Sequence, residues 1–496
     1  MPEYLRALIV VLLLATTVFA FARRPAGAVM PDADFTRRRN LWFGLTLVAF
    51  LAHSFWIYAL ITVLLLLNSA GRESNRVALF FFLIFLIPAT GTEIPGFGLI
   101  NFLFEISHVR LLELVILLPA FLVLRGRSDT LPFGRTGPDK MLAVYLLFLA
   151  LLQLREASPT GAMRDAFYLF TDVFLPYFVI SRSLKTLQDF REAMLALLLA
   201  AMVLAAIFLF ETVWHWHLYR GMASALGVSM DALSYIERSN LLRAMGPTGH
   251  PIVAGYVMTV AIGFYLFLKA TLPGGLSRRL GMALLFAGLV APLSRGPWLG
   301  AAALLVVFVA TGGNAIKRLF LLGLSGAMIL ALLSVLPGGG KVIDLLPFIG
   351  SAETGGIDYR KQLIDNTYEV ILRYPLFGSV NFALEPEMQA MIQGQGIIDV
   401  VNTYLLLALQ TGMVGLGLFA GFFALVAWGI FKGFRRLPDR EGEDYLLGRT
   451  LLATLAGALL IITTVSPIGL IPLIYWSVAG MGVAYVQMLR VREAGA

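Results

Sequence analysis

The sequence predicts an all-α, polytopic integral membrane protein, a helical bundle of about 12 to 15 transmembrane helices with one large extracytoplasmic loop. Of its 496 residues, 59% are hydrophobic and only 14% are charged, whereas soluble domains carry about 25% charged residues. Apolar runs of about 15 to 27 residues recur along the whole chain, close to the ~20 residues that a helix needs to cross a bilayer. The chain contains no cysteine, which excludes disulfides, thiolate metal sites and a cysteine nucleophile.

The distribution of charge predicts which loops face the cytoplasm. A net charge of +8 would suggest nucleic acid as the partner of a soluble protein. Here, however, Lys and Arg cluster in short loops between apolar runs, as the positive-inside rule expects. We therefore expect a multi-pass protein of a bacterial inner membrane, with the lipid bilayer and not nucleic acid as its partner. The loops expected in the cytoplasm are 23–40, 125–140, 182–191, 269–279, 317–318, 432–449 and the C-terminal tail.

The apolar runs place the helices in order. The first run, 4–22, has the length of a signal peptide, but its leading charge is slight and its basic block follows the run, which favours a retained helix. The 27-residue run 41–67 has basic residues on both flanks, so we expect a tight hairpin around His53 and Ser54. The other helices are expected at 77–92, 108–124, 139–155, 164–181, 191–214, 251–268, 278–293, 297–311, 319–336, 403–430, 448–466 and 468–488.

Two longer segments on the expected periplasmic side divide the chain. The second of them is the longest hydrophilic stretch; it opens at Pro337, and apolar residues recur at helical spacing from Tyr359 to Tyr374. This spacing predicts an amphipathic helix that lies in the interface or against the bundle. The expected parts are N-terminal transmembrane helices (1–214), transmembrane helices with a first periplasmic segment (215–336), a large periplasmic loop (337–402) and C-terminal transmembrane helices (403–496).

Three arginines lie on the side where the positive-inside rule expects few. They are Arg243, Arg295 and Arg360, and the first two stand beside Gly/Pro breaks. Each one alone is explained by a salt bridge or by snorkelling to a lipid phosphate. Together they favour a binding site, because guanidinium groups bind phosphate bidentately and stay charged. The pattern indicates a site for a lipid-linked pyrophosphate.

Other polar residues give weaker signals. His215 and His217 are two residues apart and would not share a helical face, His53 and His108 are isolated, and no metal-ligand spacing occurs, so we expect no metal site. Glu113 and Asp172 fall inside expected spans. They are explained either by a proton pathway or, as we favour, by pairing with Arg110 and other internal cations.

Four segments, in this order, resemble the O-antigen ligase and polymerase superfamily, the integral membrane glycosyltransferases that use polyprenyl-pyrophosphate-linked sugars. They span about residues 240–430, and the large loop lies between the second and fourth segments. The segments are Arg243–Gly246 with His250, Pro251 and Gly255; Ser294-Arg295-Gly296 with Trp298; Arg360 with Pro375 and Gly378; and Asp399-Val400-Val401-Asn402-Thr403-Tyr404-Leu405 with Gly412 and Gly415.

The resemblance implies an inverting glycosyl transfer that needs a polarised pyrophosphate and a base near the acceptor hydroxyl. Arg243, Arg295 and Arg360 would serve the pyrophosphate without a metal or other cofactor. Asp399 is the nearest carboxylate for the base, although a helix N-cap explains it equally well. The other candidate bases are His250, Glu385 and Glu387, and Asn402 and Tyr404 would orient the sugar or the loop by hydrogen bonding.

Ligases of this family usually carry a histidine directly before the asparagine of the fourth segment, where this chain has Val401. The Asp399–Leu405 segment is more similar to the branch associated with exopolysaccharide polymerisation. We therefore expect a polymerase of lipid-linked oligosaccharide units, with chain-length regulator and export proteins as candidate partners. The alternatives are an O-antigen ligase that transfers the polymer to lipid A core, and a transporter or flippase of lipid-linked sugars, which would show a central charged path and internal pseudo-symmetry.

Overall fold

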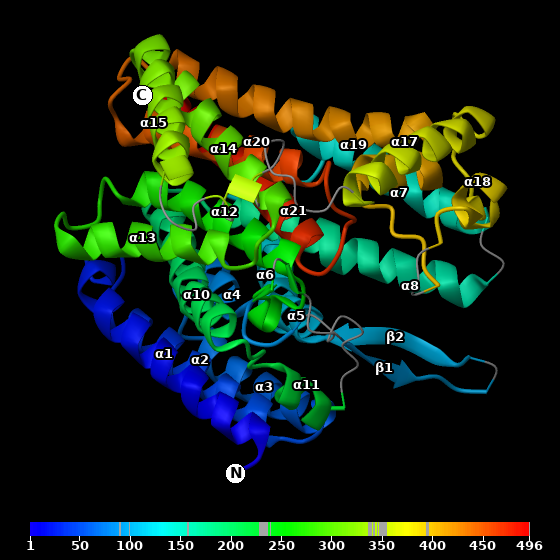
Figure 1. Ribbon diagram of the computed structural model, residues 1–496, viewed down its shortest axis with the longest axis horizontal. Coiled ribbons are helices and arrows are strands. Elements are labelled where there is room, and N and C mark those ends of the chain that lie inside the picture. Colours follow the sequence, from blue (N-terminus) through cyan, green and yellow to red (C-terminus); the bar gives the residue numbers. More distant parts are fainter. Residues whose placement is uncertain are drawn as a thin grey trace.

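The fold is an all-α membrane bundle, as the sequence predicts (Figure 1). The computed structural model describes residues 1–496 apart from 89–90, 99, 156–157, 228–236, 239, 336–339, 341–342, 345, 347–354, 393–395 and 496. Among the described residues, eight helices are long and apolar enough to cross a membrane, and two shorter apolar helices accompany them. The eight are 3–26, 137–155, 187–214, 251–268, 315–335, 403–436, 443–461 and 471–494.

The N-terminal helices confirm the predicted hairpin. Helix α1 (Glu3–Ala26) is followed by α2 (Asp32–Leu51) and α3 (Phe55–Ala70). The turn between α2 and α3 places His53 at a φ of 50°. A basic residue block flanks each arm of this hairpin, so the charge pattern and not the length of the apolar run gives the correct topology.

The predicted helix at 77–92 is wrong. Helix α4 ends early (Arg76–Leu83), and β1 (Gly91–Pro95) pairs antiparallel with β2 (Phe102–Ser107). Two features explain the break: Pro88 disfavours helical backbone in the residue before it, and His108 Nε2 hydrogen-bonds to the carbonyl of Leu83 at 2.9 Å. A helix ending inside apolar surroundings needs such a partner for its terminal carbonyls.

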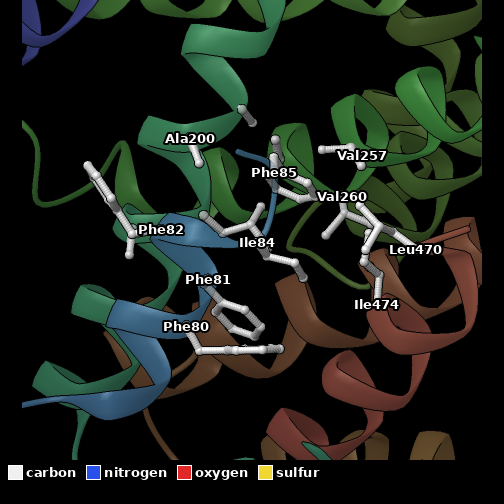
Figure 2. Close-up of a cluster of buried hydrophobic side chains, with 14 of the residues drawn as sticks. Phe80, Phe81, Phe82, Ile84, Phe85, Ala200, Val257, Val260, Leu470 and Ile474 are labelled. Carbon is white, nitrogen blue, oxygen red and sulfur yellow. The ribbon is translucent and has the colours of Figure 1, made fainter. Parts of the chain in front are cut away.

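The end of α4 lies in the centre of the bundle (Figure 2). Phe80, Phe81 and Ile84 are buried, and Figure 2 shows them in one apolar cluster with residues of other helices such as Val260 and Ile474. These partners belong to α12 (Pro251–Leu268) and α21 (Ile471–Gly495). The apolar run therefore continues through the break, which is why composition alone does not reveal it.

Two further spans are continuous helices that contain a π-helical turn. One consists of α5 (His108–Leu112), η1 (Glu113–Leu117) and α6 (Leu118–Gly126); the other of α8 (Pro159–Leu169), η3 (Phe170–Phe174) and α9 (Leu175–Ser183). Arg110 Nε and Nη2 donate to the two carboxylate oxygens of Asp172 at 3.2 and 2.9 Å. The predicted pairing with Arg110 is confirmed for Asp172, whereas both carboxylate oxygens of Glu113 are buried without a hydrogen-bond partner among the described residues.

The remaining long helices match the predicted order, and the short α11 (Arg220–Ala225) in the first expected periplasmic segment was not predicted. The long helices are α7 (Gly137–Leu152), α10 (Leu187–Trp214), α12, α13 (Leu276–Val290), α14 (Arg295–Ala310), α15 (Ala315–Val335), α19 (Thr403–Arg436), α20 (Glu443–Ile461) and α21. A short hairpin of β3 (Glu237–Arg238) and β4 (Leu241–Leu242) precedes α12. Helices α14 and α20 meet at Gly300 and Gly457, where an added Cβ on either would lie within 3 Å of the other's carbonyl oxygen. Small residues of this kind allow close helix packing in membranes.

The predicted amphipathic helix in the large loop is confirmed as α17 (Gly355–Arg373), which is followed by the short α18 (Pro386–Gln389). In Figure 1, both lie at the right of the view, near the N-terminal end of α19. Only one edge of the predicted apolar stripe is buried: Leu363 packs with Val400 and Leu409, whereas Ile364 and Tyr368 are exposed. Pro337, which opens the loop in the sequence, lies outside the described residues.

Candidate functional site

The candidate site begins at the turn between α13 and α14. Arg243 donates from Nε to the carbonyl of Pro292 at 3.2 Å and from Nη2 to Ser294 Oγ at 3.0 Å. Arg238 donates to the next carbonyl, that of Leu293, at 2.7 Å. Two arginines from the segment before α12 are thus oriented by the backbone that leads into Arg295.

The turn itself is strained and closely packed. Leu293 has a φ of 50°, a left-handed conformation that is costly for a branched aliphatic residue and is often found at functional sites. Next to it, a Cβ on Gly296 would lie 2.3 Å from Thr464 Oγ1. The loop between α20 and α21 therefore lies against the start of α14, so the position of Arg295 depends on a segment far away in the sequence.

A buried carboxylate holds the Arg243 loop in place. Glu211, near the end of α10, accepts hydrogen bonds from the backbone N–H groups of Met245 and Gly246 at 3.0 and 2.9 Å, and from that of Leu218 at 3.0 Å. The glutamate is fully buried, and such backbone bonds to a carboxylate are strong because the acceptor is charged. The sequence analysis missed Glu211; an acidic residue at the end of an otherwise apolar span is the signal that could have identified it.

Arg360 lies close to other charges that come from separate segments. Desolvation, followed by the positive charges of Arg238 and Arg295, lowers the pKa of Arg360, and the negative charge of Asp399 opposes this effect. Its side chain nevertheless opens to solvent. Arg295 donates from Nη2 to the carbonyl of Asp344 in the large loop at 3.2 Å. The structure thus brings Arg295, Arg360 and Asp399 together, with Arg238 as a fourth member that the sequence analysis missed.

Asp399 is held at the start of the fourth segment but does not cap α19. Its Oδ1 accepts a hydrogen bond from Ser466 Oγ at 2.6 Å, and its carbonyl accepts one from Tyr359 OH at 3.0 Å. The N-cap of α19 is Asn402 instead, whose Oδ1 accepts from the N–H groups of Tyr404 and Leu405 at 2.9 and 3.2 Å. The alternative explanation of Asp399 as an N-cap is therefore wrong, and its half-buried carboxylate lies near the arginines.

Tyr404 and Asn402 are engaged within the protein. The hydroxyl of Tyr404 donates to the carbonyl of Leu459 in α20 at 3.0 Å. Thr403 makes two similar bonds to the carbonyls of Ile462 and Val465. These contacts fix the fourth segment against the end of α20, so both predicted residues orient the loop in this structure.

His250 is the N-cap of α12 and is largely buried. Its Nδ1 accepts a hydrogen bond from the N–H of Ile252 at 3.1 Å, so in the neutral ring the proton lies on Nε2. Burial, together with the nearby charge of Arg243, lowers the pKa of His250 to about 4. At neutral pH the ring therefore presents an N–H donor, which suits contact with an anion better than the removal of a proton.

The two other candidate bases belong to a surface ion-pair network. Arg373 donates to Glu387 Oε1 at 2.7 Å and also to Glu385. The hydrogen bond from Arg373 lowers the pKa of the Glu387 carboxyl. Both glutamates thus fix the end of α17 to the start of α18, and the structure does not bring them into the arginine group.

The glycines of the third and fourth segments form one joint. Gly412 interrupts α19 with a φ of 66°, and an added Cβ there would lie 2.3 Å from the carbonyl carbon of Leu376. Gly378 has the same φ and equally close contacts with the other side of the break. Arg155 donates across the joint to the carbonyls of Phe377 and Gln410, at 3.0 and 3.2 Å. The segment after α17 therefore packs against the break in α19. Asp399 and Asn402 lie just before the first turn of the same helix.

Among the described residues, no group of three or more His, Cys, Asp or Glu side chains is placed to hold a metal ion.

Comparison with protein families identifies a match: residues 280–420 match the family model Wzy_C, described as O-Antigen ligase. The matched region contains Arg295, Arg360 and Asp399. It begins after Arg243 and His250, which it therefore does not include. No curated protein matches the chain.

Proposed function

We propose that this chain, an O-antigen ligase/polymerase-type membrane enzyme with its family domain at residues 280–420, polymerises polyprenyl-pyrophosphate-linked oligosaccharide units into exopolysaccharide. The observation that carries the proposal is that Arg238, Arg295 and Asp399 all lie close enough to Arg360 for their charges to affect it. These four residues come from four separate segments of the chain. Guanidinium groups beside a carboxylate suit a dianionic leaving group next to a base.

In the proposed reaction, the arginines bind the leaving group, Asp399 accepts a proton and His250 donates a hydrogen bond. Arg295 and Arg360, with Arg243 behind them, would bind the pyrophosphate through charge-assisted hydrogen bonds. The acceptor hydroxyl attacks the anomeric carbon and gives its proton to the Asp399 carboxylate, while the bond from that carbon to the pyrophosphate oxygen breaks. The polyprenyl pyrophosphate leaves on the opposite side of the sugar, which inverts the anomeric configuration. His250 would donate its Nε2 proton as a hydrogen bond to the developing charge.

The surroundings of Val401 support a polymerase over a ligase. This side chain packs with the apolar group formed by Leu363, Val370 and Met388. The position that carries histidine in the ligases is thus part of the contact between α17 and α19. Asp399, two residues earlier, is the carboxylate left to take the proton from the acceptor.

The test is a reaction with purified full-length protein and a polyprenyl-pyrophosphate-linked repeat unit. The expected product is a ladder of polymer lengths, formed also in excess EDTA because no divalent ion takes part. Loss of all activity in EDTA that returns with Mg²⁺ or Mn²⁺ would refute the metal-free mechanism. Transfer to added lipid A core, without a ladder, would instead identify a ligase.

The proposal places the site at the periplasmic face, since the basic loops of the chain are expected on the other side. A single cysteine at Gly355, at the start of α17, tests this cleanly because the chain contains no other cysteine. The cysteine should react with an impermeant thiol reagent in spheroplasts. Labelling that appears only after lysis would overturn the orientation.

A further inference from the structure

A second group of cations surrounds a cavity at the other end of α10, away from the candidate site. The cavity has a volume of about 270 Å³, and Arg76, Arg127, Arg182 and Lys185 line it. It lies where α4 and α10 begin and where α6 and α9 end. The cavity lies at the start of α10, which is Leu187, and Glu211 lies near the end of the same helix. At a rise of about 1.5 Å per residue, the cavity and Glu211 are separated by about 36 Å. This cavity is therefore distinct from the arginine group of the candidate site.

The two carboxylates that line the cavity are already neutralised or bonded elsewhere. Glu73 accepts hydrogen bonds from Arg37 Nη2 at 2.9 Å and from Arg38 Nε at 3.0 Å, and neither arginine lines the cavity. Asp189 accepts the N–H groups of Lys185 and Thr186 as part of the capping box of α10. Neither of these acids is hydrogen-bonded to the guanidinium group of Arg76 or Arg127 within the described residues.

Two of the four lining cations have partners and two are available. Arg182 donates to Asp139 at 2.6 Å, and Lys185 forms an exposed pair with Asp129, of the kind that contributes little. The side chains of Arg76 and Arg127 make no hydrogen bond or ion pair within the described part of the chain, although Arg127 lies near enough to Asp129 for its charge to lower the pKa of that carboxyl, after the larger effect of Lys185. These two guanidinium groups are free to bind an anion.

The helix ends at the cavity do not supply the anion site. Asn75 Oδ1 accepts the N–H of Ala78 at the start of α4, and Thr186 with Asp189 caps α10. The backbone N–H groups that could bind an anion are therefore already used in part by side chains. The guanidinium groups remain, and their planar pairs of donors match the oxygens of a phosphate.

Part of the cavity lining is apolar and continues onto the exposed surface of α6. Ala120, Val123 and Leu124 of α6 form this part. Val123 is 49% exposed, and its neighbour Leu122, on the same stretch of α6, is 59% exposed. A ligand that fits both parts of the lining carries a phosphate beside a hydrocarbon chain, which distinguishes a phospholipid from free phosphate.

We infer that this cavity binds the phosphate of an anionic phospholipid, with Arg76 and Arg127 on the headgroup and an acyl chain along α6. Basic pockets between transmembrane helices are suited to such headgroups. The inference is independent of the proposed function, because none of its residues belongs to the candidate site. Its consequence is a bundle stabilised by lipid charge at the end that carries the basic loops.

The test uses full-length protein in phosphatidylcholine nanodiscs, with phosphatidylglycerol or inorganic phosphate added. Phosphatidylglycerol should raise the melting temperature and remain bound in native mass spectrometry. The double variant Arg76→Gln/Arg127→Gln should weaken its binding by about tenfold or more, because charge-assisted bonds are lost. The matched control is Arg125→Gln/Arg440→Gln, one cation in the last turn of α6 and one in the loop before α20, neither of which lines the cavity, and it should change binding by less than about twofold.

Three outcomes would overturn the inference. They are equal loss of binding in the control variant, equal stabilisation by phosphatidylcholine, and protection by inorganic phosphate without any advantage for phosphatidylglycerol. The melting temperature of each variant in phosphatidylcholine alone shows whether it is folded. If the double variant is not folded, the single change Arg127→Gln at the exposed edge of the cavity takes its place, with Arg125→Gln as its control and a smaller but still selective loss expected.

Discussion

Arginines of the N-terminal helices and arginines at the candidate site are held in different ways. Arg38 is fully buried and donates from Nε to Glu73 at 3.0 Å. Arg238 and Arg243 instead donate to the carbonyls of Leu293 and Pro292. A carboxylate cancels the charge of its arginine, whereas a carbonyl orients the guanidinium and leaves its charge in place. The first arrangement places a complete ion pair inside the bundle, and the second orients two guanidinium groups against the turn that leads into Arg295.

The comparison predicts its largest effect on folding at Arg38. Arg38→Ala leaves the Glu73 carboxylate buried with fewer partners, which should destabilise the protein by about 3–5 kcal/mol. The variant should be nearly absent from the membrane by immunoblot. Arg39→Ala is the matched control, because the exposed Arg39 bonds only with Asn40 within the described residues, and it should accumulate normally. Equal abundance of the two variants would remove the distinction between the two kinds of arginine.

At Arg295 the effect should fall on activity and not on abundance. Arg295→Ala should reduce polymer formation by about 10²–10³-fold, as expected when a donor to developing charge is removed. Arg295→Lys should also lose much of the activity, because an ammonium lacks the two-pronged geometry. Polymer length on a gel is read beside membrane abundance, and Lys361→Ala, an exposed cation of α17, is the control. Near-normal polymer from Arg295→Ala would exclude this residue from the site, whereas loss of abundance with activity would indicate a structural ion pair.

The joint in α19 should give an intermediate effect. Gly412→Ala places a Cβ within 2.3 Å of Leu376 at a φ of 66°, so overpacking and backbone strain should cost about 1–3 kcal/mol. The expected result is faster proteolysis of the large loop and lower activity in a protein that still inserts. Gly417→Ala lies in the same helix with nothing within 4 Å of its added Cβ and should behave as wild type. Identical proteolysis of the two variants would show that the joint does not hold the loop.

The sequence predicted most helices because length and hydrophobicity decide them directly. Helix α12 has the predicted bounds Pro251–Leu268, and the hairpin at His53 followed from charge. The error at α4 has the same origin: Ile84–Ile87 are as buried and apolar as the helix before them. The break depends on Pro88 and on a hydrogen bond from His108, which a hydropathy pattern does not contain.

The sequence predicts a site residue where that residue departs from an expected pattern, such as the positive-inside distribution of charge. Arg243, Arg295 and Arg360 conflict with the expected charge distribution, and the structure brings the last two together with Asp399. Ser466 satisfies every local rule, so its bond to Asp399 could not be anticipated. Its role arises only when distant segments meet.

The smallest effect on activity is expected at Arg155, where a double-mutant cycle with Gly412 can test whether both residues act through the same joint. This exposed arginine donates to the carbonyls of Phe377, Gly378 and Gln410 at 3.0–3.3 Å, and so it joins the two sides of the break at Gly412. Each such bond contributes only about 0.5–1.5 kcal/mol net, so Arg155→Ala should lower the rate by less than about tenfold, without loss of abundance. Since Arg155 and Gly412 act on one joint, the double variant should lose less than the sum of the single effects. Purely additive losses in this double-mutant cycle, measured as rates of polymer formation, would mean that Arg155 affects activity by a route other than the joint.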